Sequence, residues 1–293
     1  MSAVVRTPTV VTMPSTRPIR TLLVAGGLGV AALLTATACG LVWNTLSDGL
    51  AQDTPVNEVR ISGGSGDVVV IGDDTTGVDV RRTVRYVGET KPGPTMSVSG
   101  SVLSVNTSCG MRCSASYEVH VPRGVTVTGR NDSGQVTARG VSEVDVEVDS
   151  GNIEVDGATG SVKAKADSGR IRVTDVAGSA TLTADSGNVE VDRVAGKLNV
   201  AVESGNIEVA GINGQPVMLQ ANSGNITAAL RTAGDLTARA DSGQITIEAP
   251  DDCCRITTSV DSGNTDRRLR DNPSSSALID VRTGSGNITL RAA

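Results

Sequence analysis

Residues 149–155 read Asp-Ser-Gly-Asn-Ile-Glu-Val, and this phrase returns along the second half of the 293-residue chain. Its Ser-Gly pair begins at Ser133, Ser150, Ser168, Ser186, Ser204, Ser223, Ser242, Ser262 and Ser285. The successive steps are 17, 18, 18, 18, 19, 19, 20 and 23 residues. A nearly constant period of this length indicates a stack of similar structural repeats.

Each repeat contains two short segments in which apolar and polar residues alternate. In the first segment Ile153 and Val155 flank Glu154, and in the second Val162 is followed by Lys163 and Ala164. A period of two predicts β-strands with one buried face. Ser-Gly turns and a second set of glycine-containing turns separate the strands. The Ser-Gly turns of four central repeats are Ser150, Gly151, Ser168, Gly169, Ser186, Gly187, Ser204 and Gly205.

A single coil of two strands cannot bury its apolar face, but stacked coils can, because each strand pairs with its equivalent ~4.8 Å away. Stacking places isoleucine over isoleucine and valine over valine, whereas an antiparallel meander would place unlike residues opposite one another. We therefore predict an all-β fold, a two-sided parallel β-solenoid at residues 131–293 with about 18 residues per rung and about nine rungs. The chain contains no phenylalanine, which suits a thin core rich in alanine.

The N-terminal 43 residues have the charge pattern of a membrane anchor. Residues 1–20 contain three arginines and no acidic residue, and no charged residue occurs from Thr21 to Ser47. A bilayer-spanning helix needs about 20 apolar residues, arginines favour the cytoplasmic side, and tryptophan favours the interface. We predict a disordered cytoplasmic tail at 1–20, a transmembrane helix at 21–43 ending at Trp43, and a linker at 44–56.

Two other interpretations of this leader stay open at the sequence level. It also fits a cleaved signal peptide. The small residues before Cys39 in Ala-Thr-Ala-Cys-Gly, residues 36–40, fit a lipoprotein cleavage site with Cys39 as the lipidated residue. The leading prediction is a single-pass protein of the cell membrane with extracytoplasmic repeats, and a lipoprotein is the alternative.

Residues 57–130 alternate like strands but lack the 18-residue period. Solenoids need an atypical end that shields the first rung, so we predict a β-rich N-terminal cap here. Within it, Ser-Gly-Asp-Val-Val-Val at residues 65–70 is similar to an early copy of the repeat phrase. Near the other end, residues 264–276 break the pattern with charged residues and Pro273, and we expect them to loop out.

Four cysteines follow the leader, in the pairs Cys109 with Cys113 and Cys253 with Cys254. An extracytoplasmic location favours disulfides, and four cysteines allow three connectivities. A bond from Cys109 to Cys113 fits across a turn, while Cys253 and Cys254 form either a vicinal disulfide or two thiols. A zinc site is disfavoured because the pairs are distant in sequence and the only histidine, His120, lies in an expected strand.

One repeat position is mostly acidic, and stacked carboxylates are a candidate calcium site. It holds Asp149, Asp167, Asp185, Glu203, Asn222, Asp241 and Asp261. Aspartate and asparagine before a glycine-containing turn are also ordinary turn residues that bond their own backbone. We favour turn chemistry and expect no metal and no cofactor.

The repeat phrase resembles the bacterial domain of unknown function 4097 family, also called putative adhesin or β-strand-repeat proteins. The resemblance rests on copies such as residues 149–155 and Gly-Ser-Gly-Asn-Ile-Thr-Leu at 284–290, behind one N-terminal hydrophobic segment. It covers about residues 55–293. It implies an envelope-exposed β-solenoid and supplies no catalytic residues.

The amino-acid composition disfavours two functional classes, nucleic-acid binding and carbohydrate chemistry. A net charge of −6 and a pI near 4.9 disfavour a nucleic-acid partner. A carbohydrate-active enzyme, the remote alternative, would need aromatic platforms, but Trp43, Tyr86 and Tyr117 are the only aromatic residues. We expect a non-enzymatic adhesion or envelope scaffold that binds a cell-surface protein or wall polymer, and the alternative is an envelope stress sensor or signalling accessory.

Overall fold

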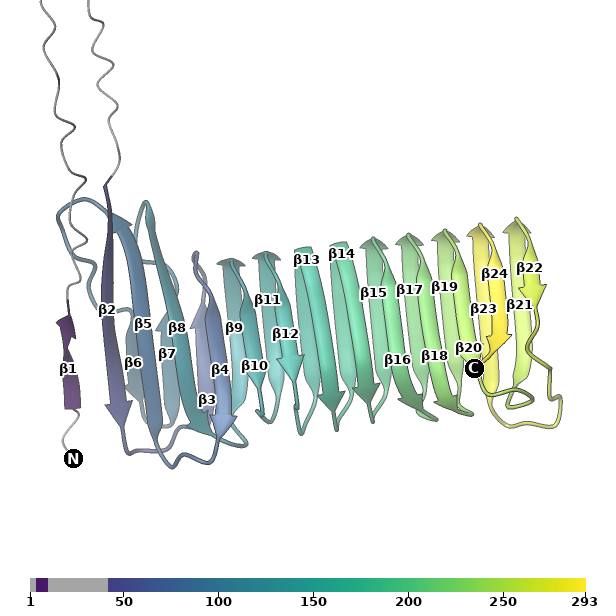
Figure 1. Ribbon diagram of the computed structural model, residues 1–293, viewed down its shortest axis with the longest axis horizontal. Coiled ribbons are helices and arrows are strands. Elements are labelled where there is room, and N and C mark those ends of the chain that lie inside the picture. The colour runs from purple at the N-terminus through teal and green to yellow at the C-terminus, as the bar shows by residue number, and fades with distance from the viewer. Residues whose placement is uncertain (1–3, 10–41) are drawn as a thin grey trace, which may run out of the picture.

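The computed structural model describes residues 4–9 and 42–293, and all of its regular elements are β-strands. They form one long stack, in which the strands run across the long axis of the molecule (Figure 1). No helix in these residues is long and apolar enough to cross a membrane. The helix predicted at 21–43 and the lipidation site Cys39 fall outside the described residues, except that Trp43 begins a strand.

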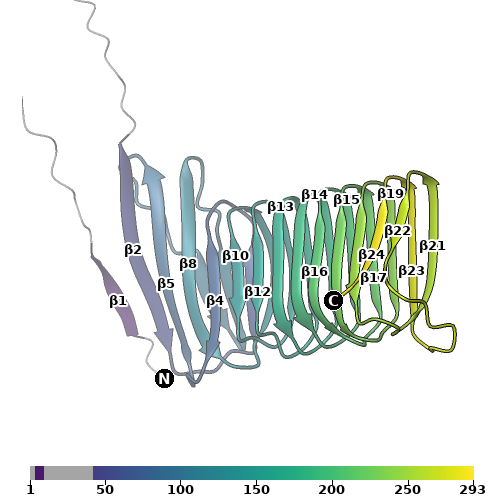
Figure 2. The ribbon, with the colours of Figure 1, turned by 45° about the vertical axis from the view of Figure 1, so that its right-hand side comes forward.

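The regular part of the stack is a parallel β-solenoid in which each turn supplies one strand to each of two sheets (Figure 2). Strands β13 and β14 bend around the Ser-Gly turn and belong to both sheets. The strands of these central turns are β11 (Val144–Ser150), β12 (Ile153–Asp156), β13 (Val162–Val176), β14 (Ala180–Val194), β15 (Leu198–Ser204), β16 (Ile207–Asn213), β17 (Val217–Ser223), β18 (Ile226–Thr232), β19 (Leu236–Ser242) and β20 (Ile245–Ala249).

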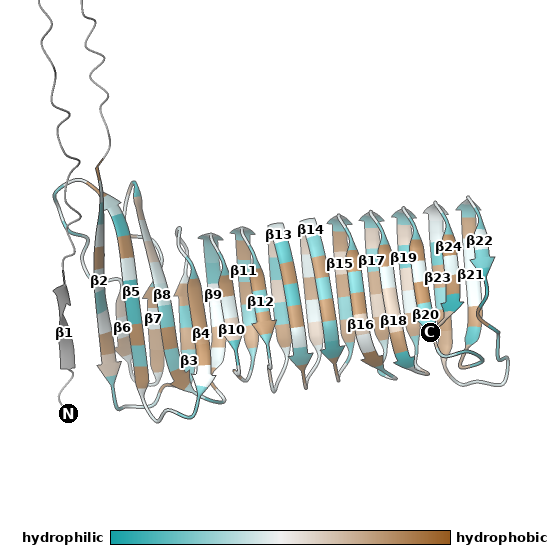
Figure 3. Cartoon of the chain, in the orientation of Figure 1, coloured by the Kyte–Doolittle hydropathy of each residue, from teal (hydrophilic) through white to brown (hydrophobic). Residues whose placement is uncertain are grey.

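The register confirms the parallel stacking that the repeat predicts. Ile153 pairs with Ile171 and Val155 with Val173, so equivalent residues of successive turns lie side by side. Their side chains are buried between the sheets, and Ile171 and Val173 have no exposed surface. Bands of apolar and polar residues therefore cross the stack along its length (Figure 3). Burial of these apolar rows is the main force that holds the turns together.

The C-terminal end of the stack departs from chain order. The last turn of the chain lies between the turn formed by β19 and β20 and the outermost turn. Ser285 thus pairs with both Ser242 and Ser262. The strands of these two final turns are β21 (Arg255–Ser262), β22 (Thr265–Arg267), β23 (Leu278–Ser285) and β24 (Ile288–Ala292). Within the predicted loop at 264–276, β22 is a short exposed strand.

The N-terminal end shows the same exchange. The turn formed by β3 (Glu58–Ser62) and β4 (Val68–Asp73) lies between two turns that follow it in the chain. Ser65 bridges to Ser133, which confirms the early repeat copy at 65–70. The flanking turns consist of β7 (Val102–Asn106) with β8 (Cys113–Pro122), and of β9 (Thr126–Ser133) with β10 (Val136–Arg139).

Antiparallel strands complete the cap. β6 (Met96–Ser99) forms a hairpin with β7, and β5 (Val78–Val87) pairs with β8. β2 (Trp43–Gln52) pairs with β5 along its whole length, and β1 (Val4–Thr9) pairs with β2. β2 thus forms a strand across much of the linker predicted at 44–56. β1 falls within the tail predicted at 1–20, of which the structure describes only residues 4–9. β5 has one edge that β8 does not cover, and pairing with β2 satisfies the backbone hydrogen bonds of that edge. β2 takes this place although apolar and polar residues do not alternate in its sequence.

Candidate functional site

The solenoid presents two flat outer faces, one over each sheet. We call the first the charged face, which is defined by the outward residues Arg172, Glu190, Asp192, Glu208 and Ala210. We call the second the neutral face, which is defined by the outward residues Thr181, Thr183, Asn199, Ala201, Met218 and Gln220. Both faces arise from the same alternation that sends the intervening residues into the core.

The neutral face consists of two rows at the β-sheet repeat. Thr181, Asn199 and Met218 form one row across β14, β15 and β17. Thr183, Ala201 and Gln220 form the other row, and a hollow of about 90 Å³ lies among the six residues. Half of the Met218 side chain is exposed, at 50%. The face therefore offers hydroxyl and amide groups around an apolar thioether.

The charges at the β13 border of the neutral face are paired with one another. Lys163 Nζ lies 3.2 Å from Asp145 Oδ2, and Lys165 Nζ lies 3.1 Å from Glu147 Oε1. Lys165 also contacts Asp167 at 3.0 Å, and this hydrogen bond is the largest of the effects that raise the pKa of Lys165. The border thus keeps the neutral face free of uncompensated positive charge on this side.

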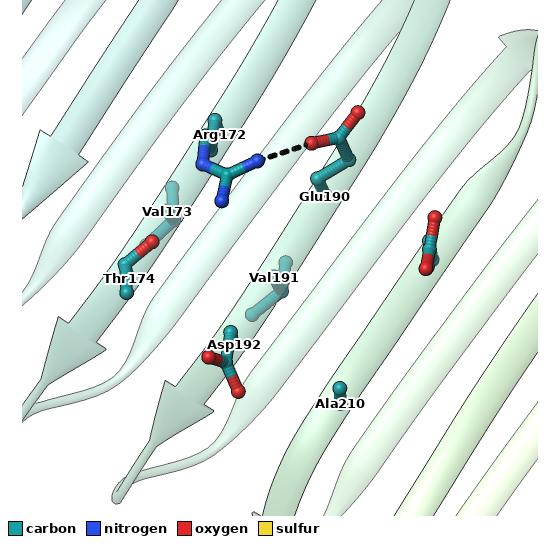
Figure 4. Close-up of a pocket in the computed structure, with 8 residues that line it drawn as sticks. Arg172, Val173, Thr174, Glu190, Val191, Asp192 and Ala210 are labelled. Carbon is teal, nitrogen blue, oxygen red and sulfur yellow. Dashed lines mark hydrogen bonds and ion pairs between the residues drawn. The ribbon is translucent and has the colours of Figure 1, made fainter.

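The charged face contains an ion pair that joins successive turns. Arg172 Nη1 donates to Glu190 Oε2 at 2.7 Å (Figure 4), and Arg170 Nε lies 3.4 Å from the other oxygen of the same carboxylate. Glu208 follows Glu190 in the next turn. Because such pairs are exposed, each contributes about 0–1 kcal/mol to stability. A hollow of about 120 Å³ lies beside them.

The size of these hollows decides the kind of ligand. Sites for small molecules typically enclose about 300–1,000 Å³, several times the volume of either hollow. Each hollow accommodates one small group of an extended partner rather than a whole substrate. Among the described residues, no group of three or more His, Cys, Asp or Glu residues is placed to hold a metal ion.

Two of the acidic side chains before the Ser-Gly turns lie against basic side chains. Asp149 lies 2.7 Å from Arg130, and Asp167 pairs with Lys165 as described above. Carboxylates bound to cations in this way do not converge on a common centre, as calcium ligation requires. The arrangement favours the structural interpretation of the acidic positions over the calcium site.

Within the turns, the serines and glycines stack in rows. Ser150 pairs with Ser168, Ser168 with Ser186, and Ser186 with Ser204. Gly169 has a φ of +138°, and a Cβ added there would lie 1.8 Å from the carbonyl oxygen of Gly151. Gly187 and Gly205 approach the preceding turn in the same way, as does Gly151. These glycines allow the backbones to approach closely.

An asparagine ladder is the feature of the turns that sequence reasoning missed. The side-chain oxygen of Asn188 accepts a hydrogen bond from the backbone N–H of Asn206 at 3.0 Å. Asn206 accepts from Asn225 at 3.1 Å in the following turn, and Asn225 from Gln244 at 3.0 Å. The signal in the sequence is the recurrence of Asn directly after Ser-Gly. The ladder satisfies backbone donors at the bends of the coil.

The structure joins the cysteines within their local pairs. Cys109 and Cys113 form a disulfide with Cα atoms 5.4 Å apart, which closes a short loop before β8. Cys253 and Cys254 form a vicinal disulfide with Cα atoms 3.8 Å apart. The two bonds lie at opposite ends of the stack, so they do not form a common centre.

His120 lies on the surface of the cap between two acids. Its Nδ1 is 2.8 Å from Asp73 Oδ2, and its Nε2 is 3.4 Å from Glu118 Oε1. The hydrogen bond with Asp73 is the main cause that raises the pKa of His120, and the same bond lowers the pKa of Asp73. These contacts give His120 a local electrostatic role, and they involve no cysteine.

A protein-family model described as Toastrack DUF4097 matches residues 56–291. Among solved structures, the chain is similar to a putative adhesin from Bacteroides fragilis NCTC 9343, with 12% identity and a TM-score of 0.38, over 84% of this chain and 97% of that chain. A putative adhesin from Parabacteroides distasonis ATCC 8503 matches with 15% identity and a TM-score of 0.38, over 85% and 97%. A putative cell adhesion protein from Clostridium sporogenes ATCC 15579 matches with 11% identity and a TM-score of 0.27, over 84% and 99%. No curated protein matches the chain.

Proposed function

The chain belongs to the Toastrack DUF4097 family, and from this premise and its two faces we propose that it is a non-enzymatic binding scaffold of the cell envelope. We further propose that its neutral face binds an uncharged stretch of a cell-wall glycan. The observation that carries the proposal is the pair of rows on β14, β15 and β17, which offer hydroxyl, amide and thioether groups without charge.

The chemistry of these rows suits a sugar polymer. Hydroxyl and amide groups both donate and accept hydrogen bonds, as glycan hydroxyls and acetamido groups require. Met218 adds an adaptable apolar contact for the C–H face of a sugar ring. The rows place a small polar or apolar group on each of three successive turns, so several weak contacts add up to avidity without an enclosed pocket.

The proposed location is the outer face of the cell membrane, with the uncharged segment before Val42 as the anchor. The two disulfides support an oxidising compartment. A single membrane span at residues 21–41 places residues 4–9 on the side opposite β2, so the pairing of β1 with β2 does not persist in the anchored protein. Cleavage before Cys39 would also remove β1.

A matched pair of substitutions tests the choice of face. Ala201→Arg places a long cationic side chain in the middle of the neutral rows, and Ala210→Arg makes the same change beside the hollow of the charged face. We expect Ala201→Arg to weaken co-sedimentation with purified cell walls about tenfold or more, which corresponds to about 1.4 kcal/mol or more. Ala210→Arg should leave binding unchanged.

The reverse order of effects would contradict the proposal, and so would wall binding that neither variant reduces. Both alanines lie outside the core, and circular dichroism and thermal melting of each variant establish that the fold is intact. If the wild-type chain co-sediments with an envelope protein but not with protein-free glycan, the partner is a protein rather than the wall.

A further inference from the structure

Exposed apolar side chains gather at one end of the N-terminal cap. Among the described residues, the large apolar side chains with high exposure are Val42 at 71%, Trp43 at 51%, Met111 at 96% and Met218 at 50%. Three of these four belong to the cap. Met218 lies on the neutral face, so it is separate from this group.

The three side chains come from segments that the fold brings to the same end. Trp43 starts β2 and pairs with Val87, the last residue of β5. The backbone N–H of Val87 donates to the carbonyl oxygen of Arg112 at 3.2 Å, which fixes the 109–113 loop beside the end of β5. In Figure 1 these strand ends, at the top of β2, β5 and β8, rise above the row of turns of the solenoid.

Two arginines accompany the apolar side chains. The guanidinium carbon of Arg85 lies 5.8 Å from the centre of the Trp43 ring, and Arg112 is exposed next to Met111. No ion pair engages Arg85 or Arg112 in the part of the chain that the structure describes. The Cys109–Cys113 disulfide restricts the backbone of the loop that carries Met111 and Arg112. The loop is therefore preorganised before it contacts a partner.

The chain itself indicates what this end contacts. The residue before the described segment is Leu41, and the run from Thr21 to Leu41 contains no charge. Tryptophan favours the membrane interface, and arginine attracts anionic lipid headgroups. Because these two arginines and the apolar side chains lie where the uncharged run enters the described chain, the group is suited to an anionic bilayer surface.

We propose that Met111 and Arg112, together with Trp43 and Arg85, form a second contact with the membrane surface, which we call the membrane rim. This rests on the anchoring in the proposed function. Two contacts, from segments far apart in sequence, fix the orientation of the molecule. Because the strands of the cap point toward the bilayer and the stack runs across them, the solenoid lies along the membrane, with both faces open at its sides (Figures 1 and 2).

The single tryptophan makes the test direct. The test uses full-length protein in vesicles of phosphatidylglycerol and phosphatidylcholine. The fluorescence of Trp43, and its quenching by lipids brominated near the headgroup, measures insertion of the anchor into the bilayer. The double variant Trp43→Phe/Met111→Trp moves the only tryptophan to the 109–113 loop. Its fluorescence should shift to shorter wavelength and should be quenched by the brominated lipids. The matched variant Trp43→Phe/Met218→Trp should show neither change.

The outcomes separate the membrane rim from the anchor. Quenching of Trp43 without quenching at position 111 would overturn the membrane rim and leave the anchor intact. Absence of quenching at both positions would mean that the anchoring in the proposed function is wrong. Adding Arg85→Gln and Arg112→Gln to the position-111 reporter should weaken its quenching at least twofold in anionic vesicles, and undiminished quenching would contradict the role of the arginines.

Discussion

At the scale of the residue, glycine and asparagine set the bends of the coil. Each Ser-Gly glycine lies against the backbone of a neighbouring turn, where a Cβ has no room, and Gly169 is representative. Asparagine in the following position bonds the backbone of the next turn, as Asn188 does with Asn206. The repeat phrase therefore specifies the stacking distance in its polar residues as well as in its apolar rows.

Replacement of Gly169 by alanine tests this account of the bend. The added Cβ would lie 1.8 Å from the carbonyl oxygen of Gly151, and backbone cannot move aside as a flexible side chain can. We expect the free energy of unfolding to fall by about 3 kcal/mol, measured by urea denaturation. The control Ser168→Ala alters an exposed neighbour and should change stability by less than about 0.5 kcal/mol. Equal effects of the two changes would contradict the close approach.

At the scale of the element, a buried arginine fastens the antiparallel part of the cap. The Arg82 side chain on β5 is 2% exposed, and its Nε donates to Asp48 Oδ1 on β2 at 2.7 Å. Its Nη1 donates to Gly93 O and Thr95 Oγ1, each at 2.7 Å. Burial alone would lower the pKa of Arg82, but the hydrogen bond and charge of Asp48, together with Tyr117, raise the pKa overall. The arginine therefore stays charged and holds β2 to β5.

Removing the carboxylate charge should loosen the cap. Asp48→Asn leaves the buried Arg82 cation without its counter-charge, and we expect the free energy of unfolding to fall by about 3 kcal/mol. The control Asp53→Asn, at an exposed position just after β2, should be nearly neutral. Hydrogen exchange at the amides of β2 and β5 measures the effect locally. Unchanged protection in Asp48→Asn would show that the pair does not hold β2.

These elements show how far sequence reasoning reaches. Strict alternation and a repeating Ser-Gly phrase predicted the parallel register, including pairs such as Ile153 with Ile171. β2 was missed because its pattern of buried residues is irregular, and its place depends on Arg82 and the free edge of β5. The separation of the outer surface into a charged and a neutral face became clear only when the register aligned Ala201 with Gln220.

At the scale of the whole molecule, both ends of the solenoid use the same exchange of turns. The turns nearest the chain ends, β3 with β4 and β23 with β24, lie one position inside the stack. The polypeptide continues both before and after each of the two outermost parallel turns. Neither edge of the stack is therefore formed by a turn that contains a chain terminus. End turns of a solenoid otherwise lack a neighbour, and this arrangement restrains them. The sequence does not reveal this exchange, because strand pairing over 43 residues, as between Leu236 and Ile279, leaves no local signal.

Photo-crosslinking in living cells distinguishes binding of the cell wall by the neutral face from binding by the charged face. A photoreactive residue replaces Gln220 on the neutral face, and in a matched strain it replaces Glu208 on the charged face, both exposed. An anchor-only protein supplies the background. We expect capture of wall glycan from position 220 well above that background and above capture from position 208. Equal capture from the two positions, or none from position 220, would contradict it.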